Sequence, residues 1–244
     1  MLLSAIYDRF CYLMNLDPTE NNESEIREEL NLLLVQLHAY YDRQQLESSA
    51  ALHEIERACH HRLRLLQNRL LCRCESGQTY VCDINEMAEN ICCACDLALS
   101  PKDRGVIFDS REGDVLISCN PGIISSILLN MISNACLHTT GTLIKVTLRQ
   151  TDCGVMLKTS SRGKIDFESL SASFNTEGSG TAAMLSGARL HKASIMWCNT
   201  NENACCAICL PVGEIEGDYY TPPDFVELLC DRLSIIYTGL CGII

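Results

Sequence analysis

Two stretches near the N-terminus place apolar side chains three and four residues apart, the spacing of one face of a helix. The stretches are residues 23–45, which Asn22 or Ser24 can cap, and residues 49–73. Their apolar positions are Ile26, Leu30, Leu33, Leu34 and Leu37 in the first and Leu52, Ile55, Leu63, Leu66 and Leu70 in the second. Two long helices joined by a short connection are typical of a helical hairpin.

One hairpin of this length leaves part of its leucine stripe uncovered. A second copy would bury that stripe in a four-helix bundle, so we expect a homodimer. The alternative is a monomer in which the apolar C-terminal tail covers the stripe. The tail side chains suited to this are Phe225, Leu228, Leu229 and Ile235.

After the run CESGQ the helical period stops, and short apolar runs typical of strands begin. Three helical stretches lie between these runs, near residues 84–98, 121–137 and 180–191. This order predicts an α+β chain whose larger part is an α/β sandwich with a mixed sheet. Four segments result: an N-terminal segment (1–21), the hairpin (22–75), the sandwich (76–212) and a C-terminal tail (213–244).

The net charge of −12 at pH 7 argues against a nucleic-acid partner and against binding to an anionic membrane surface. No apolar run reaches the length of a membrane span. The N-terminus carries Asp8 and Arg9 where a secretory signal needs apolar residues. We therefore expect a cytoplasmic protein.

The chain has 17 cysteines. In a long chain without an export signal we expect reduced thiols that serve as small apolar residues. Cys206 and Cys209 have CxxC spacing, but no second pair follows at the spacing of a zinc ribbon. They also lie in an alternating, strand-like run that would send them to opposite faces. We do not expect a zinc site.

Two amides interrupt the apolar helix predicted over ILLNMISNACLHT, residues 127–139. Asn130 and Asn134 are four residues apart and therefore point to one side of the helix. Burying an amide without partners costs roughly 1 to 3 kcal/mol, so such a pair is expected where a ligand bonds to both. The alternative is that both cap nearby loops or face water.

The order of the hairpin, the strand runs, the asparagine-bearing helix and a glycine-bearing loop that opens another helix resembles the sensor histidine kinases. Their ATP-binding half is a Bergerat-type α/β sandwich shared with the wider GHKL ATPases. In that family an N-x-x-x-N-A helix presents its amides to the phosphates and Mg²⁺. Asn130, Asn134 and Ala135 fall on this motif, with Asn134 at the metal-binding position.

The run GSGTAAMLSGARLHK, residues 178–192, resembles the G-x-G-x-x-[IL] loop and helix of the same family. Glycines there let the backbone approach phosphates, and the helix N-terminus supplies free N–H groups and a positive dipole. The resemblance implies ATP and Mg²⁺ as cofactors. It implies a nucleotide-binding set of Asn130, Asn134, Gly178, Ser179 and Gly180.

The run SEIREELNLLL, residues 24–34, aligns with the phosphoacceptor motif H-E-[LI]-R-T-P-L-N of these kinases. Ser24 stands where the phosphorylated histidine belongs, and Glu29 stands where the proline belongs. A serine hydroxyl lacks the basicity of an imidazole near neutral pH, so we assign no catalytic residue. The hairpin histidines that might replace it are His38, His53, His60 and His61.

The sequence also departs from the family at the adenine site. The D-x-G-x-G motif would fall in TSSRGKI, where Ser160 or a neighbour replaces the aspartate and Arg162 replaces a glycine. Leu137 stands where a basic residue often reaches the phosphates. Losing a hydrogen bond to a buried carboxylate costs about 1.5 to 3 kcal/mol, or about ten- to a hundredfold in affinity. We expect ATP binding to be weak or lost.

The resemblance therefore implies a histidine-kinase-like protein of two-component signalling that is degenerate and acts as a dimeric regulatory or binding module. Its implied partners are a second copy, bound through the hairpin, and a response regulator or another signalling protein. The alternative is an active ATP-dependent protein kinase of the GHKL superfamily that phosphorylates a partner protein.

Overall fold

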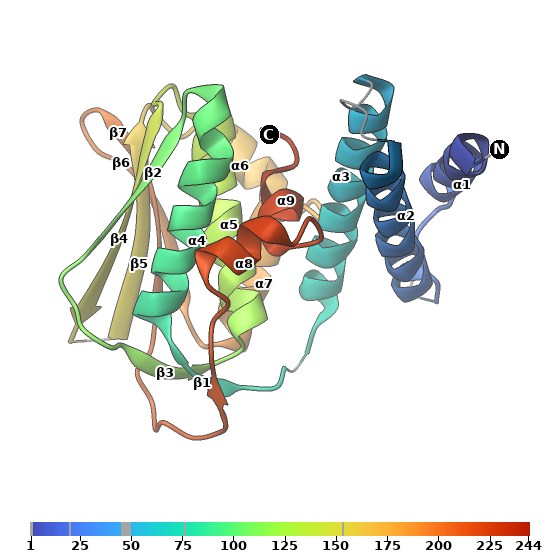
Figure 1. Ribbon diagram of the computed structural model, residues 1–244. Helices are drawn as coiled ribbons and strands as arrows, with labels where there is room; N and C mark the ends of the chain where they lie inside the picture. The colour runs from blue at the N-terminus through green and yellow to red at the C-terminus, as the bar shows by residue number, and fades with distance from the viewer. Residues whose placement is uncertain (1, 20, 45–49, 76, 153) are drawn as a thin grey trace. The chain divides into compact units, whose positions relative to one another are not determined.

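The computed structural model describes residues 2–19, 21–44, 50–75, 77–152 and 154–244 (Figure 1). They form two compact units, Met1–Gln67 and Asn68–Ile244. The first unit is helical, and the second contains every described strand. The four segment boundaries drawn from the sequence stay predictions.

Three helices build the helical unit: α1 (Leu2–Asn15), α2 (Glu23–Gln44) and α3 (Ala50–Arg73), the last of which runs on into the second unit. The helices α2 and α3 occupy the two stretches with leucine periodicity. Their predicted connection falls on residues 45–49, outside the described residues. Helix α1, which the sequence analysis left as an unassigned segment, packs on α2.

The apolar side chains at helical spacing in this unit are mostly buried within the chain. Ile6 and Leu13 of α1 are each 1% exposed, and Leu30, Leu34 and Leu37 of α2 are fully buried. Burial of this kind contributes about 1.5 to 3 kcal/mol for each leucine-sized side chain. The stripe that the dimer prediction uses is thus covered in a single chain, and the homodimer stays a prediction.

The sandwich contains two sheets, and the larger has the strand order β2-β4-β5-β7-β6. Strand β2 (Gly105–Ser110) pairs in parallel with β4 (Leu143–Thr151), and the other three pairings are antiparallel. The remaining strands of this sheet are β5 (Gly154–Arg162), β6 (Ser194–Asn199) and β7 (Asn203–Leu210). The smaller sheet is β3-β1-β8, from β3 (Leu116–Cys119), β1 (Tyr80–Asp83) and β8 (Tyr219–Tyr220). The predicted mixed sheet is confirmed.

Helices cover one face of the larger sheet (Figure 1). They are α4 (Ile84–Leu99), α5 (Pro121–His138), α6 (Phe167–Phe174) and α7 (Gly180–Leu190), with a 3-10 turn, η1, at Ser100–Lys102. Helices α4, α5 and α7 lie where the spacing of apolar residues predicted helices. Helix α5 begins where Asn120 accepts a hydrogen bond from the Ile123 amide at 3.1 Å, and Pro121 suits the first helical position because it lacks an N–H.

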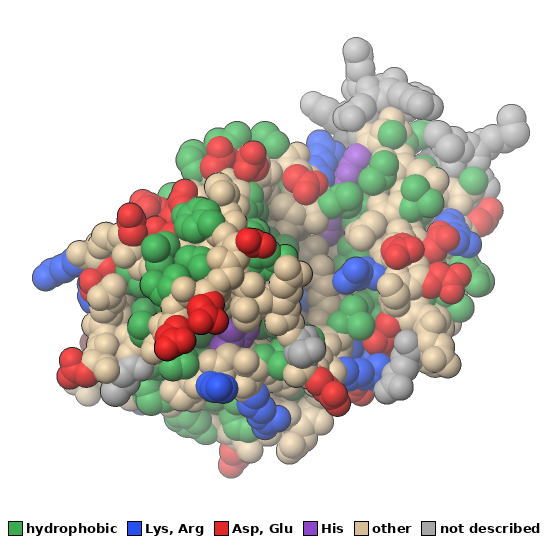
Figure 2. Space-filling model, turned by 90° about the horizontal axis from the view of Figure 1, so that it is seen from below, with side chains coloured by type: hydrophobic (Ala, Val, Ile, Leu, Met, Phe, Trp, Pro, Cys, Tyr) green, Lys and Arg blue, Asp and Glu red, His purple; other side chains and the backbone are tan. Residues whose placement is uncertain are grey.

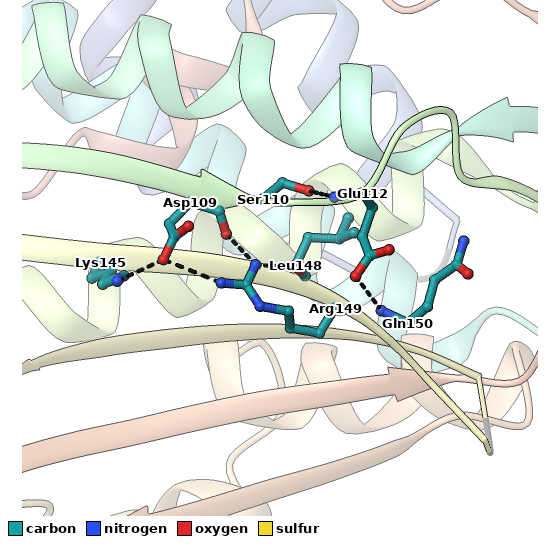
Figure 3. A network of polar contacts seen from close by, with 7 residues as sticks. All are labelled: Asp109, Ser110, Glu112, Lys145, Leu148, Arg149 and Gln150. Atoms are coloured by element: carbon teal, nitrogen blue, oxygen red, sulfur yellow. Dashed lines mark hydrogen bonds and ion pairs between the residues drawn. The ribbon is translucent and has the colours of Figure 1, made fainter.

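Alternation along β4 decides which face of the sheet meets these helices. Ile144, Val146 and Leu148 are buried, whereas Lys145 and Arg149 lie on the other face. On that outer face the Asp109 carboxylate contacts Lys145 Nζ at 2.6 Å and Arg149 at 3.2 Å (Figure 3). These hydrogen bonds, first to Lys145 and then to Arg149, lower the pKa of Asp109. The contacts join β2 to β4.

The C-terminal tail folds onto the sandwich. Its helices α8 (Phe225–Cys230) and α9 (Ile235–Leu240) pack on α4 and α5 (Figure 1). Leu228, Ile236 and Leu240 are buried there. These apolar side chains of the tail are therefore buried within the sandwich unit itself. On the face drawn in Figure 2, basic side chains lie among acidic and apolar ones and do not form a continuous positively charged patch.

Candidate functional site

A cavity of about 370 Å³ lies in the sandwich unit, between helices α5, α6 and α7 and the inner face of the larger sheet. Its volume falls within the range of small-molecule sites. The lining residues are Met131, Asn134, Ala135, His138, Thr139, Thr159, Ile165, Asp166, Ser169, Leu170, Ser173, Ser179, Gly180, Thr181, Trp197, Ala204, Cys205 and Cys206.

The two amides of α5 have different surroundings. Asn134 lines the cavity, and its side chain makes no hydrogen bond among the described residues. Asn130 is 4% exposed and does not line the cavity. Its Nδ2 donates to the Ser126 carbonyl at 3.0 Å and to Asn68 Oδ1 at 3.4 Å. One amide is available to a ligand, and the other is bonded within the fold.

The residues of the glycine loop, 178–180, also differ in their surroundings: some line the cavity and one bonds within the fold. Ser179 and Gly180 line the cavity, whereas Gly178 does not. The Gly178 carbonyl accepts a hydrogen bond from Asn68 Nδ2 at 3.2 Å, and its backbone has a φ of 83°, which favours glycine. A Cβ on Gly180 would lie 2.5 Å from Asn130 Oδ1, so only glycine fits beside that amide. The nucleotide role predicted for Asn130 and Gly178 stays a prediction.

Helix α7 begins at the cavity, but part of its N-terminus is already capped. Ser179 Oγ accepts a hydrogen bond from the Ala182 amide at 3.0 Å and donates to the Ser173 carbonyl at 2.6 Å. A helix N-terminus attracts anions through its unpaired N–H groups. Here the side chain of Ser179 satisfies one of those groups.

The carboxylate among the described lining residues is that of Asp166, which is exposed to solvent. Asp166 caps α6 by accepting hydrogen bonds from Ser169 Oγ at 2.7 Å and the Glu168 amide at 3.0 Å. These bonds, led by the one from Ser169, lower the pKa of Asp166 and keep it ionised at neutral pH. Among the described lining residues, the chain places no lysine or arginine, and Leu137 is exposed where the family has a basic residue. The described lining therefore offers phosphates no lysine or arginine to pair with.

The register of β5 corrects the position expected for the missing aspartate. Thr159 is 2% exposed and lines the cavity, whereas Ser160 is half-buried and is not among the lining residues. Successive side chains of a strand point to opposite faces, so only one of the two can face the cavity. Thr159 Oγ1 donates to the Cys206 carbonyl at 3.4 Å. Of Ser160 and its neighbours, the residue that lines the cavity is therefore Thr159.

The sequence analysis did not identify three further lining residues. Trp197 comes from β6 and stacks at a tilt on Phe174, with ring centroids 5.4 Å apart. Asp166 and Ile165 directly precede α6. A tryptophan in a short apolar run could have been suspected, because its ring is large enough to line a pocket.

In the helical unit the predicted phosphoacceptor position is exposed. Ser24 lies in the first turn of α2 and is exposed to solvent. His38 Nε2 lies 2.7 Å from Glu56 Oε1, and His53 Nδ1 lies 3.6 Å from the other Glu56 oxygen. Burial lowers the pKa of His60 to about 4, and nearby His38 also lowers it while Glu56 raises it. His60 is therefore neutral at physiological pH.

The described residues contain neither a cluster of metal ligands nor a membrane-spanning helix. No group of three or more His, Cys, Asp and Glu side chains in that part of the chain is arranged to hold a metal ion. None of the helices in the described ranges has both the length and the apolar character needed to cross a bilayer.

No family profile matches the sequence, and no curated protein is similar to it at the sequence level. Solved structures do match the fold. The Acinetobacter baumannii histidine kinase AdeS matches with 15% identity and a TM-score of 0.54, over 88% of this chain and 96% of that one. Full-length ShkA in complex with AMPPNP matches with 15% identity and a TM-score of 0.58, over 79% of this chain and 46% of that one.

The catalytic domain of histidine kinase ThkA matches with 18% identity and a TM-score of 0.50, over 55% of this chain and 96% of that domain. The AdeS match covers more of the chain than the sandwich unit supplies, so it includes part of the helical unit. At these identities the similarity concerns the fold alone. The protein is a mixed α and β chain with the fold of histidine kinase ATPase domains.

Proposed function

We propose that the protein is a histidine-kinase-like signalling protein of two-component type that has lost autophosphorylation and works as a regulatory or binding module. One observation carries this proposal. The cavity of a histidine kinase ATPase fold is kept, with Asn134 directed to it, but its one described acidic group is Asp166 and its described lining lacks lysine and arginine. ATP binding with Mg²⁺ is therefore weak or lost.

The acceptor position supports the same proposal. Ser24 is accessible, but a hydroxyl is not the nucleophile that forms a phosphohistidine. Two of the four hairpin histidines are poor substitutes. His60 is buried and neutral, and the imidazole of His38 is hydrogen-bonded to Glu56.

The second candidate is an active ATP-dependent kinase that phosphorylates a partner protein, for which a response regulator is the proposed acceptor. The open cavity and the unused amide of Asn134 favour it. An active kinase must bind Mg²⁺-ATP productively, whereas a regulatory or binding module need not.

Incubation of the full chain with γ-labelled ATP and Mg²⁺ separates these candidates. We expect no acid-labile, base-stable phosphate on the wild-type chain, because phosphohistidine needs an imidazole acceptor. An active sensor kinase treated in parallel shows that the conditions support transfer. Label that appears on this chain as phosphohistidine, or passes to an added response regulator, would contradict the proposal.

Dimer formation belongs to the proposal and has its own test. Leu33 and Leu66 are buried. Among the described side chains of α2, the large apolar ones exposed for a second copy are Leu32 and Val35, which are 51% and 48% exposed. They lie three residues apart on one helix face. The double variant Leu32→Glu with Val35→Glu should sediment as a monomer, whereas the exposed Gln36→Glu should sediment like the wild type. Equal sedimentation of both variants would exclude an interface on this face.

A further inference from the structure

We propose that the cavity of the sandwich takes an uncharged heteroaromatic ligand of nucleoside size in preference to a nucleoside triphosphate. This inference rests on the proposed function, because it names the ligand class of the cavity that the degenerate kinase fold retains. It starts from the mismatch between the lining and the phosphates of ATP.

The first step is electrostatic. A triphosphate needs positive charge around it, and the described lining has no lysine or arginine. Its carboxylate is that of Asp166, an exposed residue at the cavity that its bonds to Ser169 and Glu168 hold in place. The N-terminus of α7 adds a partial positive charge, but Ser179 and the Ser173 carbonyl are placed beside it. An uncharged ligand avoids the repulsion from Asp166.

The second step concerns hydrogen bonds that the fold leaves unused. Thr181 is 6% exposed and lines the cavity, and among the described residues neither its side chain nor that of Asn134 makes a hydrogen bond. Thr159, whose hydroxyl donates to Cys206, keeps lone pairs that can accept a hydrogen bond. A ligand that carries both donors and acceptors can form hydrogen bonds with these three side chains.

The third step is the shape and polarity of the wall. Trp197, Met131 and Leu170 give the cavity aromatic and apolar surface on more than one side. Flat rings pack well on tryptophan, and polarisable methionine adapts to their edges. A ring system that carries a few amino, carbonyl or hydroxyl groups matches this mixture. Nucleosides and their free bases have this chemistry.

The chain offers a direct probe, because Trp197 is its single tryptophan. The full chain is titrated with adenosine, adenosine monophosphate and Mg²⁺-ATP while the tryptophan emission is followed. The three ligands share one chromophore, so the correction for their absorbance is the same. We expect a saturable change with adenosine, and an affinity for Mg²⁺-ATP that is about tenfold weaker or more.

Variants assign the effect to the named groups. Asn134→Ala should weaken adenosine binding about fivefold to tenfold through loss of one hydrogen bond. Asp166→Asn keeps a side chain that can cap α6 but removes the charge, so it should narrow the difference between adenosine and ATP. Ser160→Ala, on the opposite side of β5, is the matched control and should bind like the wild type.

Several outcomes would overturn the inference. ATP binding as tight as adenosine binding would exclude the proposed selectivity. An affinity difference that Asp166→Asn leaves unchanged would exclude Asp166 as its cause. If adenosine, guanosine and adenine all leave the emission unchanged, the ligand class is wrong. None of these results bears on the loss of autophosphorylation, which the labelled-phosphate assay decides separately.

Discussion

The helical unit and the sandwich use their polar groups in opposite ways. In the helical unit, His38 and Glu56 bond to each other, and His60 is buried in its neutral form. In the sandwich, Asn134 and Thr181 face a cavity, and their side chains make no hydrogen bond among the described residues. The polar groups of the first unit serve structure, whereas the second keeps groups that a ligand can bind. A chain of this fold that does not phosphorylate itself, as we propose, can therefore still bind a ligand.

The largest effect should come from a charge placed in the helical core. Leu33 is 1% exposed, so Leu33→Glu buries a carboxylate and should lower the free energy of unfolding by about 3 to 5 kcal/mol. The same change at exposed Gln36 should cost less than about 0.5 kcal/mol. Urea unfolding followed by circular dichroism compares the two. Similar losses at both positions would show that this helix face is not buried.

The next effect is a pH dependence confined to the helical unit. Burial lowers the pKa of His60 from 6.5 to about 4, so between these values the unfolded state binds the extra proton. Stability from this group is therefore complete above pH 6.5, is lost as the pH falls, and amounts to about 3 kcal/mol. His60→Gln should flatten the stability profile between pH 6.5 and 4, whereas His61→Gln, at an exposed position, should not. A slope that survives His60→Gln belongs to another group.

The third prediction separates the two amides of α5. Asn130→Ala removes the partner of Asn68 and should lower the free energy of unfolding by about 1 to 3 kcal/mol. Asn134→Ala removes no hydrogen bond of the fold, so its stability should change by less than about 0.5 kcal/mol. Thermal unfolding without ligand measures both. Equal losses would mean that Asn134 also has a structural role.

The smallest effect concerns the register of β5. Ser160→Asp should change ligand affinity by less than about twofold, because its side chain does not face the cavity. Thr159→Asp should change it more, in either direction, because that position lies in the lining. Calorimetric titration with adenosine provides the comparison. A strong response to Ser160→Asp alone would return the site to the register first expected from the sequence.

Much of the sandwich follows from the sequence, because the apolar period locates α4, α5 and α7 to within a few residues. The apolar spacing of Ile6 and Leu13 would also have identified α1, which was left unassigned. Asn134, Ser179 and Gly180 could be placed at the cavity because their motifs are local.

The rest of the cavity depends on features that the sequence does not fix. The run TSSRG is polar throughout, so no apolar alternation sets the register of β5, and Thr159 could not be told from Ser160. Trp197 and Asp166 reach the cavity from distant parts of the chain through the strand order. The bond between Asn130 and Asn68 joins α5 to the end of α3, which a local motif does not encode.

Hydrogen exchange of the full chain with and without adenosine tests most directly whether ligand binding belongs to the sandwich alone. Adenosine should slow exchange in the first turn of α7, in β6 around Trp197 and in the segment that leads into α6, since these elements line the cavity. Exchange in α1 and α2 should stay unchanged. Protection that appears in the helical unit, or no protection at the cavity, would contradict the account.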